Sequence, residues 1–194
     1  MKSENSFSRK TRETEIKGSI HVYGKGDISI NTGTGFFDHL LNTFAFFSGM
    51  DLKLTVKGDL QVDDHHTVED TGIVLGQALN SCCDKNTPIH RYGFYMLSMD
   101  EVLTRVTVDV SGRSFLDYNA DFSREVIGGL ALENIKEFFL ALVREAGMTL
   151  HIDVLKSGND HHQAESIFKC FGKALQQAVS LSQSKVQSTK YEDI

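Results

Sequence analysis

Asp64-His65-His66-Thr67-Val68-Glu69-Asp70 and Asp160-His161-His162-Gln163-Ala164-Glu165-Ser166 are two copies of one motif, Asp-His-His-x-x-Glu, in the two halves of the chain. In a helix, residues four apart lie on one face, so His65 lies above Glu69 and His161 lies above Glu165. The second histidine of each motif points about a quarter-turn away from the first, so one motif reaches two cations.

Imidazole and carboxylate groups together suit manganese, iron, zinc or nickel better than magnesium or calcium. A single His-His-x-x-Glu is weak evidence, because an exposed helix N-terminus also carries such residues. A second copy in the same chain makes two exposed helix N-termini without a metal a much weaker interpretation. The repeated motif therefore predicts metal binding in both halves.

Composition limits the class of protein. The chain has 194 residues, 40% of them hydrophobic and 24% charged, which is typical of a globular protein with a substantial core. The net charge of -6, without any basic run, argues against a nucleic-acid partner.

No stretch approaches a membrane span or a signal peptide, so we expect a cytoplasmic protein with no membrane partner. Cys82, Cys83 and Cys170 lack zinc-site spacing and are predicted to be small core residues in a reducing compartment.

The hydrophobic pattern predicts mixed helices and strands. Residues 14–23 and 28–30 alternate apolar and polar side chains on either side of a glycine-containing turn, which predicts a β-hairpin. A helix is predicted over residues 36–47, ending near Gly49, followed by a strand at 52–56 and the first His-His helix. Beyond Pro88 the pattern restarts with a strand at 102–110, an irregular stretch including 117–124, a helix at 130–143, a strand at 150–154 and the second His-His helix.

Constant spacings indicate an internal duplication. His65 and His161 lie 96 residues apart, and Gly49-Met50 lies 98 residues before Gly147-Met148. On the latter spacing His39 corresponds to Glu137, and both residue types bind metals. The candidate ligands therefore divide evenly between the halves, and two metals per chain follow. They are His39, His65, His66, Glu69, Glu137, His161, His162 and Glu165.

The duplication predicts an α+β fold with pseudo-twofold symmetry. Each repeat reads as strand, strand, helix, strand, helix, and its two amphipathic helices can cover the apolar face of its small sheet. We expect residues 1–88 to form the first repeat and residues 89–194 the second. The short junction near Pro88 favours one compact body over two free domains.

Several motifs, in order and in spacing, resemble the imidazoleglycerol-phosphate dehydratase family over nearly the whole chain. Besides the two His-His motifs, these are Arg12-Glu13-Thr14, Gly35-Phe36-Phe37-Asp38-His39, Met99-Asp100-Glu101, Ser111-Gly112-Arg113 and Phe168-Lys169. The resemblance implies dehydration of imidazole glycerol phosphate to imidazole acetol phosphate in histidine biosynthesis. It also implies two Mn²⁺ per subunit, a homo-oligomeric shell of 24 subunits with active sites at subunit interfaces, and a ribosomal protein S5 domain 2-like fold with helices between two small mixed sheets.

The resemblance assigns roles to particular residues. Glu13 is implied as the acid/base that moves the proton, while metal-bound imidazole delocalises the charge. Arginine forks and lysines suit a phosphate without a glycine-rich loop. The implied substrate-binding residues are Glu13, His39, His65, Glu69, Arg91, Arg113, His161, Lys169, Ser188, Thr189 and Lys190.

One position departs from the family pattern. Many members have a histidine where this chain has Glu137, in Lys136-Glu137-Phe138-Phe139. A carboxylate also binds these metals, so Glu137 stays among the candidate ligands.

Two other functions account for part of the pattern. A di-metal hydrolase also uses histidine and glutamate pairs, but it normally needs an open water site, and here every ligand type is duplicated. A structural or storage metal protein explains the His-His motifs without the arginines. An assay for loss of water from imidazole glycerol phosphate separates the three.

Overall fold

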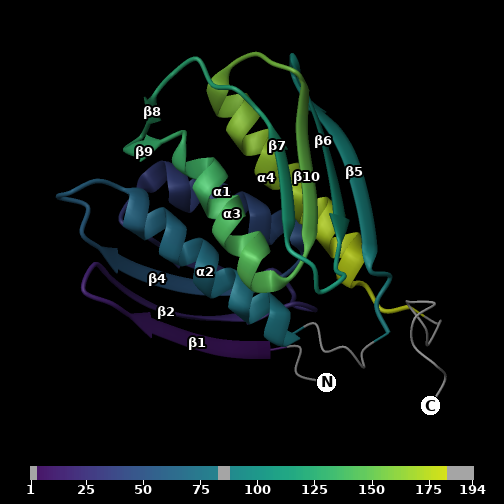
Figure 1. Ribbon diagram of the computed structural model, residues 1–194, viewed down its shortest axis with the longest axis horizontal. Helices are drawn as coiled ribbons and strands as arrows, with labels where there is room; N and C mark the ends of the chain where they lie inside the picture. The colour runs from purple at the N-terminus through teal and green to yellow at the C-terminus, as the bar shows by residue number, and fades with distance from the viewer. Residues whose placement is uncertain (1–3, 83–87, 183–194) are drawn as a thin grey trace.

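The computed structural model describes residues 4–82 and 88–182. In these ranges two four-stranded sheets enclose four helices (Figure 1). The first sheet contains β1 (Glu4–Lys10), β2 (Thr14–His21), β3 (Ile28–Asn31) and β4 (Asp51–Gly58), and the second contains β5 (Tyr92–Met99), β6 (Val102–Asp109), β7 (Phe115–Asn119) and β10 (Thr149–Lys156). The helices are α1 (Gly35–Ser48), α2 (His65–Cys82), α3 (Asn134–Ala146) and α4 (Asp160–Val179). Two short strands, β8 (Val126–Ile127) and β9 (Leu130–Ala131), form a small separate ribbon.

The two sheets have the same topology. Their strand orders are β1-β2-β4-β3 and β5-β6-β10-β7, and in each the last strand of the order runs parallel to its neighbour while the other pairs are antiparallel. Ile20 lies opposite Leu52 in the first sheet, as Val108 lies opposite Leu150 in the second. The backbone thus repeats with the spacing found in the sequence.

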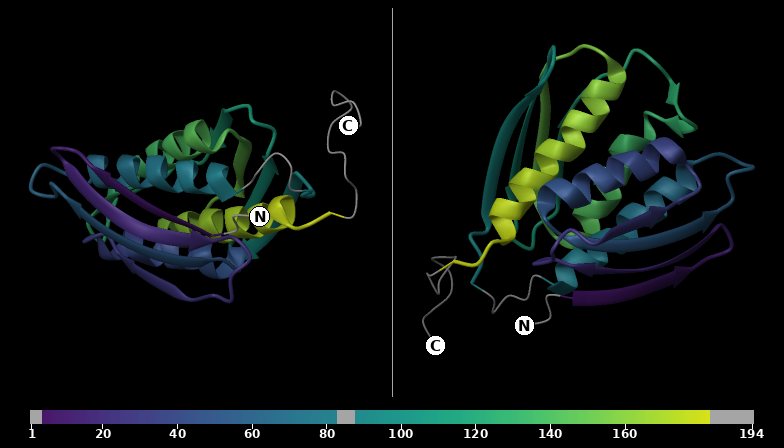
Figure 2. Two further views of the ribbon diagram at one scale, coloured as in Figure 1. Left: turned by 90° about the horizontal axis from the view of Figure 1, so that it is seen from below. Right: turned by 180° about the vertical axis from the view of Figure 1, so that it is seen from behind.

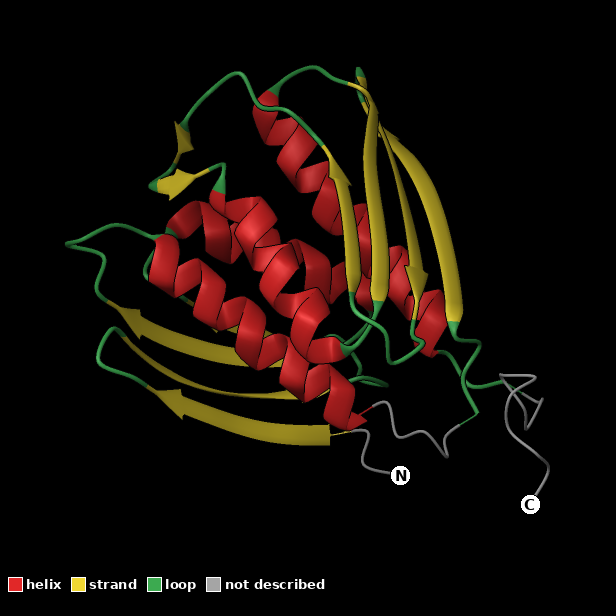
Figure 3. Cartoon of the chain, in the orientation of Figure 1, coloured by secondary structure: helices red, strands yellow, loops and turns green. Residues whose placement is uncertain are grey.

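The helices fill the space between the sheets (Figure 3). Helix α2 packs on β1 and β2, α4 packs on β5 and β6, and the two repeats meet where α1 packs on α4 and α2 packs on α3 (Figure 2). Glycine allows the close helix contacts, because a Cβ at Gly76 would lie 2.5 Å from the carbonyl oxygen of Leu142. A Cβ at Gly172 would lie 2.8 Å from that of Phe44.

Phenylalanines join the two repeats into one core. Phe37, Phe138 and Phe168 are each 1% exposed or less, and the ring of Phe138 lies 5.6 Å from that of Phe37 and 5.5 Å from that of Phe168. Aromatic pairs at such separations contribute stability beyond their buried area. The expected stripe of α2, including Val68 and Leu79, is also buried.

The α+β fold with helices between two mixed sheets is confirmed. Strand β1 in the first repeat and strands β5, β7, β8 and β9 in the second were not predicted, and Leu130 lies in β9 rather than in α3, which begins at Asn134. The expected hairpin between residues 14–23 and 28–30 is wrong. Strand β4 lies between β2 and β3, and β3 reaches β4 only through the crossover helix α1. The predicted end of α1 is right, since Gly49 has a φ of 71° and ends the helix in the left-handed conformation.

The junction between the repeats lies beside the end of α4. Ile89 pairs with Leu181, and the amide of Ser182 donates to the carbonyl of Pro88 at 2.8 Å. Cys82 and Cys170 are buried free thiols, whereas Cys83 lies outside the described residues. None of the helices in the described ranges combines the length and the hydrophobicity that a membrane crossing requires.

Candidate functional site

Both His-His motifs occupy the first turn of a helix. The Asp63 carboxylate accepts the amide of His65 at 2.9 Å, and the Asn159 side chain accepts the amide of His161 at 2.9 Å. Such side chains satisfy amides that have no partner within the helix. The two capping residues are again 96 apart, so each motif starts its helix in the same way.

The α1–α4 cluster consists of His39 from α1 with His161 and Glu165 from α4. The Nε2 atoms of His39 and His161 lie 3.3 and 3.2 Å from one oxygen of Glu165. One ligand atom from each residue lies within 4.8 Å of the others. Two imidazole nitrogens and a carboxylate at this separation suit one transition-metal ion.

Lys169 forms an ion pair with Glu165. Its ammonium group lies 2.8 Å from the second carboxylate oxygen, one helical turn along α4. Burial opposes ionisation of Glu165, but the hydrogen bonds from Lys169 and His39 outweigh it and lower the pKa of this carboxyl. Glu165 is therefore held as a carboxylate, the form that binds a metal.

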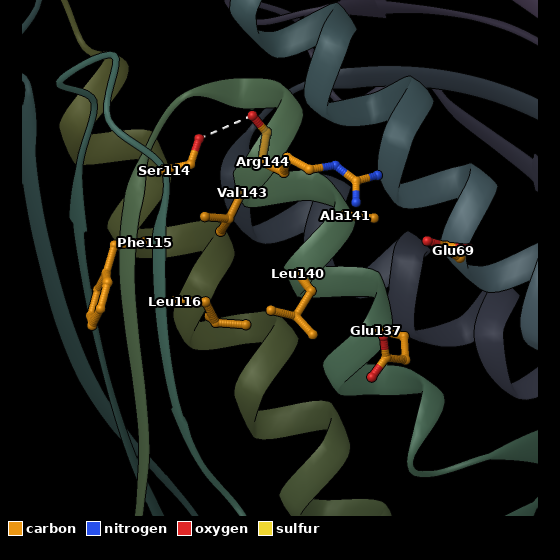
Figure 4. Close-up of a pocket in the computed structure, with 9 residues that line it drawn as sticks. All are labelled: Glu69, Ser114, Phe115, Leu116, Glu137, Leu140, Ala141, Val143 and Arg144. Carbon is orange, nitrogen blue, oxygen red and sulfur yellow. Dashed lines mark hydrogen bonds between the residues drawn. The ribbon is translucent and has the colours of Figure 1, made fainter.

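The α2–α3 cluster consists of His65 and Glu69 from α2 with Glu137 from α3. The His65 Nε2 atom lies 3.8 Å from Glu69, and its Nδ1 atom lies 3.0 Å from the side-chain oxygen of Asn134. Since that oxygen can only accept, Nδ1 carries the proton and Nε2 presents a lone pair. Glu69 and Glu137 line a pocket of about 300 Å³, in which Figure 4 shows them on neighbouring helices.

The two clusters are equivalent under the duplication. Helices α1 and α3 contribute His39 and Glu137 at corresponding positions, and α2 and α4 contribute a histidine and a glutamate four residues apart. The spacing of 98 residues thus relates two residues that the structure places near the starts of corresponding helices.

The second histidine of each motif turns away from its own cluster. The Nδ1 atom of His66 lies 3.0 Å from Asp59, and that of His162 lies 3.3 Å from Glu101. Asp59 raises the pKa of His66 above its ordinary value through this hydrogen bond, against a smaller effect of burial. His162, Asp100 and Glu101 also lie close enough together to hold a cation. Both histidines leave Nε2 unused by these contacts.

The first aspartate of each motif accepts hydrogen bonds from the backbone of the segment around β8 and β9. Asp160 accepts the amides of Ser123 and Arg124 at 3.0 and 2.9 Å, and Asp64 accepts the amide of Ala131 at 2.9 Å. The ribbon of β8 and β9 therefore runs from one His-His helix to the other. Both aspartates belong to the repeated motif, so the duplication marks them as residues of interest. Nothing in the sequence indicates which residues they bind.

Glu13 lies in the exposed turn between β1 and β2. It is close enough to His66 for its charge to raise the pKa of that histidine further. The corresponding turn of the second repeat carries Glu101, which contacts His162. Glu13 is therefore on the His66 side of the molecule rather than in either cluster.

Arg91 and Arg113 form an arginine pair on Asp109. Arg91 makes two hydrogen bonds to Asp109, at 2.7 and 3.1 Å, and Arg113 lies 3.7 Å from the same carboxylate. The amide of Arg91 donates to the carbonyl of Ala178 in the last turn of α4, whereas His161 lies in the first. At about 1.5 Å per residue, these ends of α4 are about 25 Å apart.

The arginine pair is also distant from the α2–α3 cluster. Gly147, which follows α3, packs against Gly112, next to Arg113. Glu137 lies about 15 Å back along α3 from that contact. Neither cluster shares its position with the arginine pair of the same chain. The remaining phosphate candidates, Ser188, Thr189 and Lys190, lie outside the described residues.

Comparison with known proteins identifies relatives of the whole chain. A family model described as imidazoleglycerol-phosphate dehydratase matches residues 32–175. The imidazoleglycerol-phosphate dehydratase of Staphylococcus carnosus is 47% identical over 94% of this chain and 95% of its own length. That of Chlorobaculum parvum is 43% identical over 95% of each chain.

Solved structures with this fold have the same description. The crystal structure of imidazoleglycerol-phosphate dehydratase from Staphylococcus aureus aligns with a TM-score of 0.84 and 40% identity, covering 92% of this chain and 99% of that one. The Pyrococcus furiosus enzyme, solved in complex with (S)-C348, aligns with a TM-score of 0.82 and 35% identity, covering 95% and 98%.

Proposed function

The chain belongs to the imidazoleglycerol-phosphate dehydratase family, and we propose that it removes water from imidazole glycerol phosphate with two Mn²⁺ bound per subunit, at sites shared between subunits. Members of the family are hydro-lyases of histidine biosynthesis, and the product of the dehydration is imidazole acetol phosphate. The observation that carries the metal proposal is the α1–α4 cluster, whose three ligand atoms converge, together with its counterpart under the duplication, formed by His65, Glu69 and Glu137.

The donor set of each cluster fits a manganese ion. Nitrogen and carboxylate ligands converge in the α1–α4 cluster, and Glu165 is held ionised there. In the α2–α3 cluster, Asn134 fixes the tautomer of His65 that exposes Nε2. When bound, the ions supply Lewis-acid stabilisation of negative charge on the imidazole ring of the substrate.

The chain's own residues provide the proton transfer and the orientation. Glu13 is the proposed group that moves the substrate proton, because its carboxylate is exposed and lies on the His66 side. His66 and His162 face away from the clusters of their own chain. We therefore propose that they complete the clusters of neighbouring subunits.

The position of the arginine pair, the proposed phosphate site, also supports a substrate site built from two subunits. A three-carbon chain separates the substrate's ring from its phosphate, and it spans less than about 10 Å. The arginine pair lies about 25 Å from the α1–α4 cluster of the same chain. A substrate molecule bound at the α1–α4 cluster of one subunit therefore needs the arginine pair of another.

The outer face of the second sheet supports a homo-oligomer. Tyr92, Phe94 and Met96 on β5 are 60%, 53% and 43% exposed, and Phe115 on β7 is 55% exposed. At the corresponding positions of the first sheet, β1 presents Glu4, Ser6 and Ser8. Only one of two homologous faces is apolar, which is typical of a surface that a partner covers.

This apolar face continues to Asp109, which holds the arginine pair. A neighbouring subunit that covers it would lie beside the phosphate site. We propose a shell of 24 subunits, which light scattering of the metal-loaded protein tests.

The activity is tested on purified, manganese-loaded and fully assembled protein with imidazole glycerol phosphate. We expect mass spectrometry to show a product lighter by one water, no product after chelation, and recovery when manganese is returned. Arg91→Ala should raise KM about ten- to a hundredfold, since a charge-assisted pair of hydrogen bonds is lost. Absence of product from the loaded assembly contradicts the proposal.

A further inference from the structure

A chain of hydrogen bonds holds the turn that carries Glu13. The amides of Glu13 and Thr14 donate to the hydroxyl oxygen of Thr11 at 3.1 and 2.9 Å. The hydroxyls of Thr11 and Thr14 lie 3.3 Å apart. The Thr14 hydroxyl in turn reaches the carboxylate of Asp70.

Asp70 fixes the direction of this chain. An ionised carboxylate only accepts, so the Thr14 hydroxyl donates to Asp70 and the Thr11 hydroxyl donates to Thr14. Thr14 and Asp70 are only 3% and 7% exposed, and Arg9 donates to the other carboxylate oxygen of Asp70 at 3.1 Å. Hydrogen bonds that are linked in a chain strengthen one another, and the burial of Thr14 and Asp70 fixes the geometry of this end of the chain.

The far end of the chain belongs to the metal-binding helix. Asp70 directly follows Glu69 and lies four residues after His66, so it shares a helix face with that histidine. The turn of α2 that presents His66 therefore also anchors the Glu13 turn. Any shift of α2 would be passed to Glu13 through Asp70.

The second repeat shows that this anchor is not a general requirement of the fold. Ser166 occupies the position that corresponds to Asp70, and its hydroxyl lies 2.6 Å from Thr104. The Glu101 carboxylate, which corresponds to Glu13, is already used, since it accepts the amide of Asn159 at 2.6 Å. Asp70 thus occurs in the first repeat, where the Glu13 carboxylate has no hydrogen-bond partner among residues 4–82 and 88–182.

We infer that Asp70 is a positioning residue for Glu13, acting through the hydroxyls of Thr14 and Thr11. It holds the Glu13 turn at a fixed position relative to His66, on which the reaction geometry depends. This inference rests on the proposed role of Glu13 in proton transfer.

The test removes the hydroxyl and keeps the side-chain shape. In Thr14→Val we expect kcat to fall about ten- to a hundredfold, because small displacements of a reacting group cost this much. KM, manganese content and oligomer size should stay unchanged. Thr14→Ser, which restores the hydroxyl, should recover most of kcat. If Thr14→Val does not assemble, Thr11→Val removes the acceptor of the Glu13 amide at a less buried position.

A double-mutant cycle with Glu13→Gln separates positioning from destabilisation. If Asp70 acts through Glu13, adding Thr14→Val to Glu13→Gln lowers kcat no further. Thr104→Val is the matched control, because it removes an equally buried hydroxyl from the second repeat, and it should leave kcat near the wild-type value. Equal losses from Thr14→Val in both backgrounds overturn the inference. An unchanged kcat in Glu13→Gln alone instead shows that the proposed role of Glu13 is wrong.

Discussion

Assembling two impaired variants into one shell should restore activity if each substrate site combines parts of two subunits. His161→Ala removes a ligand of the α1–α4 cluster, and Arg91→Ala removes half of the arginine pair. These groups lie about 25 Å apart in one chain, too far for one substrate molecule to contact both. In a hybrid shell, a site that receives its cluster from an Arg91→Ala chain and its arginines from a His161→Ala chain is intact.

The expected recovery follows from random assembly. With equal amounts of the two variants, half of the clusters and half of the arginine pairs are intact, so about one quarter of the sites have both. The hybrids are made by co-expression with two affinity tags, purified through both tags, and assayed well below the wild-type KM, where a ten- to hundredfold rise in KM leaves Arg91→Ala with about 1 to 10% of the wild-type rate. A matched mixture of separately assembled variants is the control and should stay at the level of the single variants.

The refuting result is equally definite. If each site lies within one chain, every chain in the hybrid carries a defect, and activity remains at the level of the single variants. Such a result in shells shown to contain both chains would mean that the arginine pair does not hold the phosphate of a neighbouring subunit's substrate.

Three further predictions address metal content, packing and pH. His65→Ala should lower bound manganese from about two ions per chain to about one, measured by elemental analysis, because it removes a ligand from one cluster only; unchanged content would contradict the assignment. Gly76→Ala should lower the free energy of unfolding by about 1 to 3 kcal/mol in denaturant titrations, because its Cβ would lie 2.5 Å from the Leu142 carbonyl oxygen; Gly35→Ala, whose Cβ would meet no atom within 4 Å, is the steric control. In metal-free protein, Asp59→Asn should lower Tm at pH 5.5 and leave it nearly unchanged at pH 9. Asp59 raises the pKa of His66, so its stabilising effect is fully present below the unfolded value of 6.5 and is lost as pH rises through the folded value; an equal loss at both pH values would count against it.

The duplication explains why so much of the site was predictable. A helix places residues four apart on one face whatever surrounds it, so the pairs His65–Glu69 and His161–Glu165 followed from spacing alone. The spacing of Gly-Met pairs then related His39 to Glu137. The structure places these two residues near the starts of the corresponding helices α1 and α3.

Strands β1, β5, β7, β8 and β9 escaped prediction, and β1 and β5 did so for opposite reasons. The inner face of β1 carries Phe7 between Asn5 and Arg9, so its apolar signal is a single residue. Strand β5 is apolar on both faces, with Phe94 outward and Leu97 inward, which removes the alternation that marks a half-buried strand. Both strands lie at sheet edges, where fewer neighbours constrain the sequence.

Long-range partners could not be read from the sequence. Asp70 contacts Arg9 and Thr14 across about 60 residues, and no local pattern links them. The same is true of Asn134, which fixes the tautomer of His65. These contacts depend on how α2 packs on the first sheet and on α3, which is set by the whole core.

The central claim is that each metal site joins two subunits. Anomalous diffraction at the manganese edge, from crystals of the assembled enzyme, tests it most directly. Two peaks per chain are expected, one at His39, His161 and Glu165 and one at His65, Glu69 and Glu137, each also contacted by a His66 or His162 imidazole of a neighbouring subunit. Peaks ligated only by residues of a single chain would contradict the account.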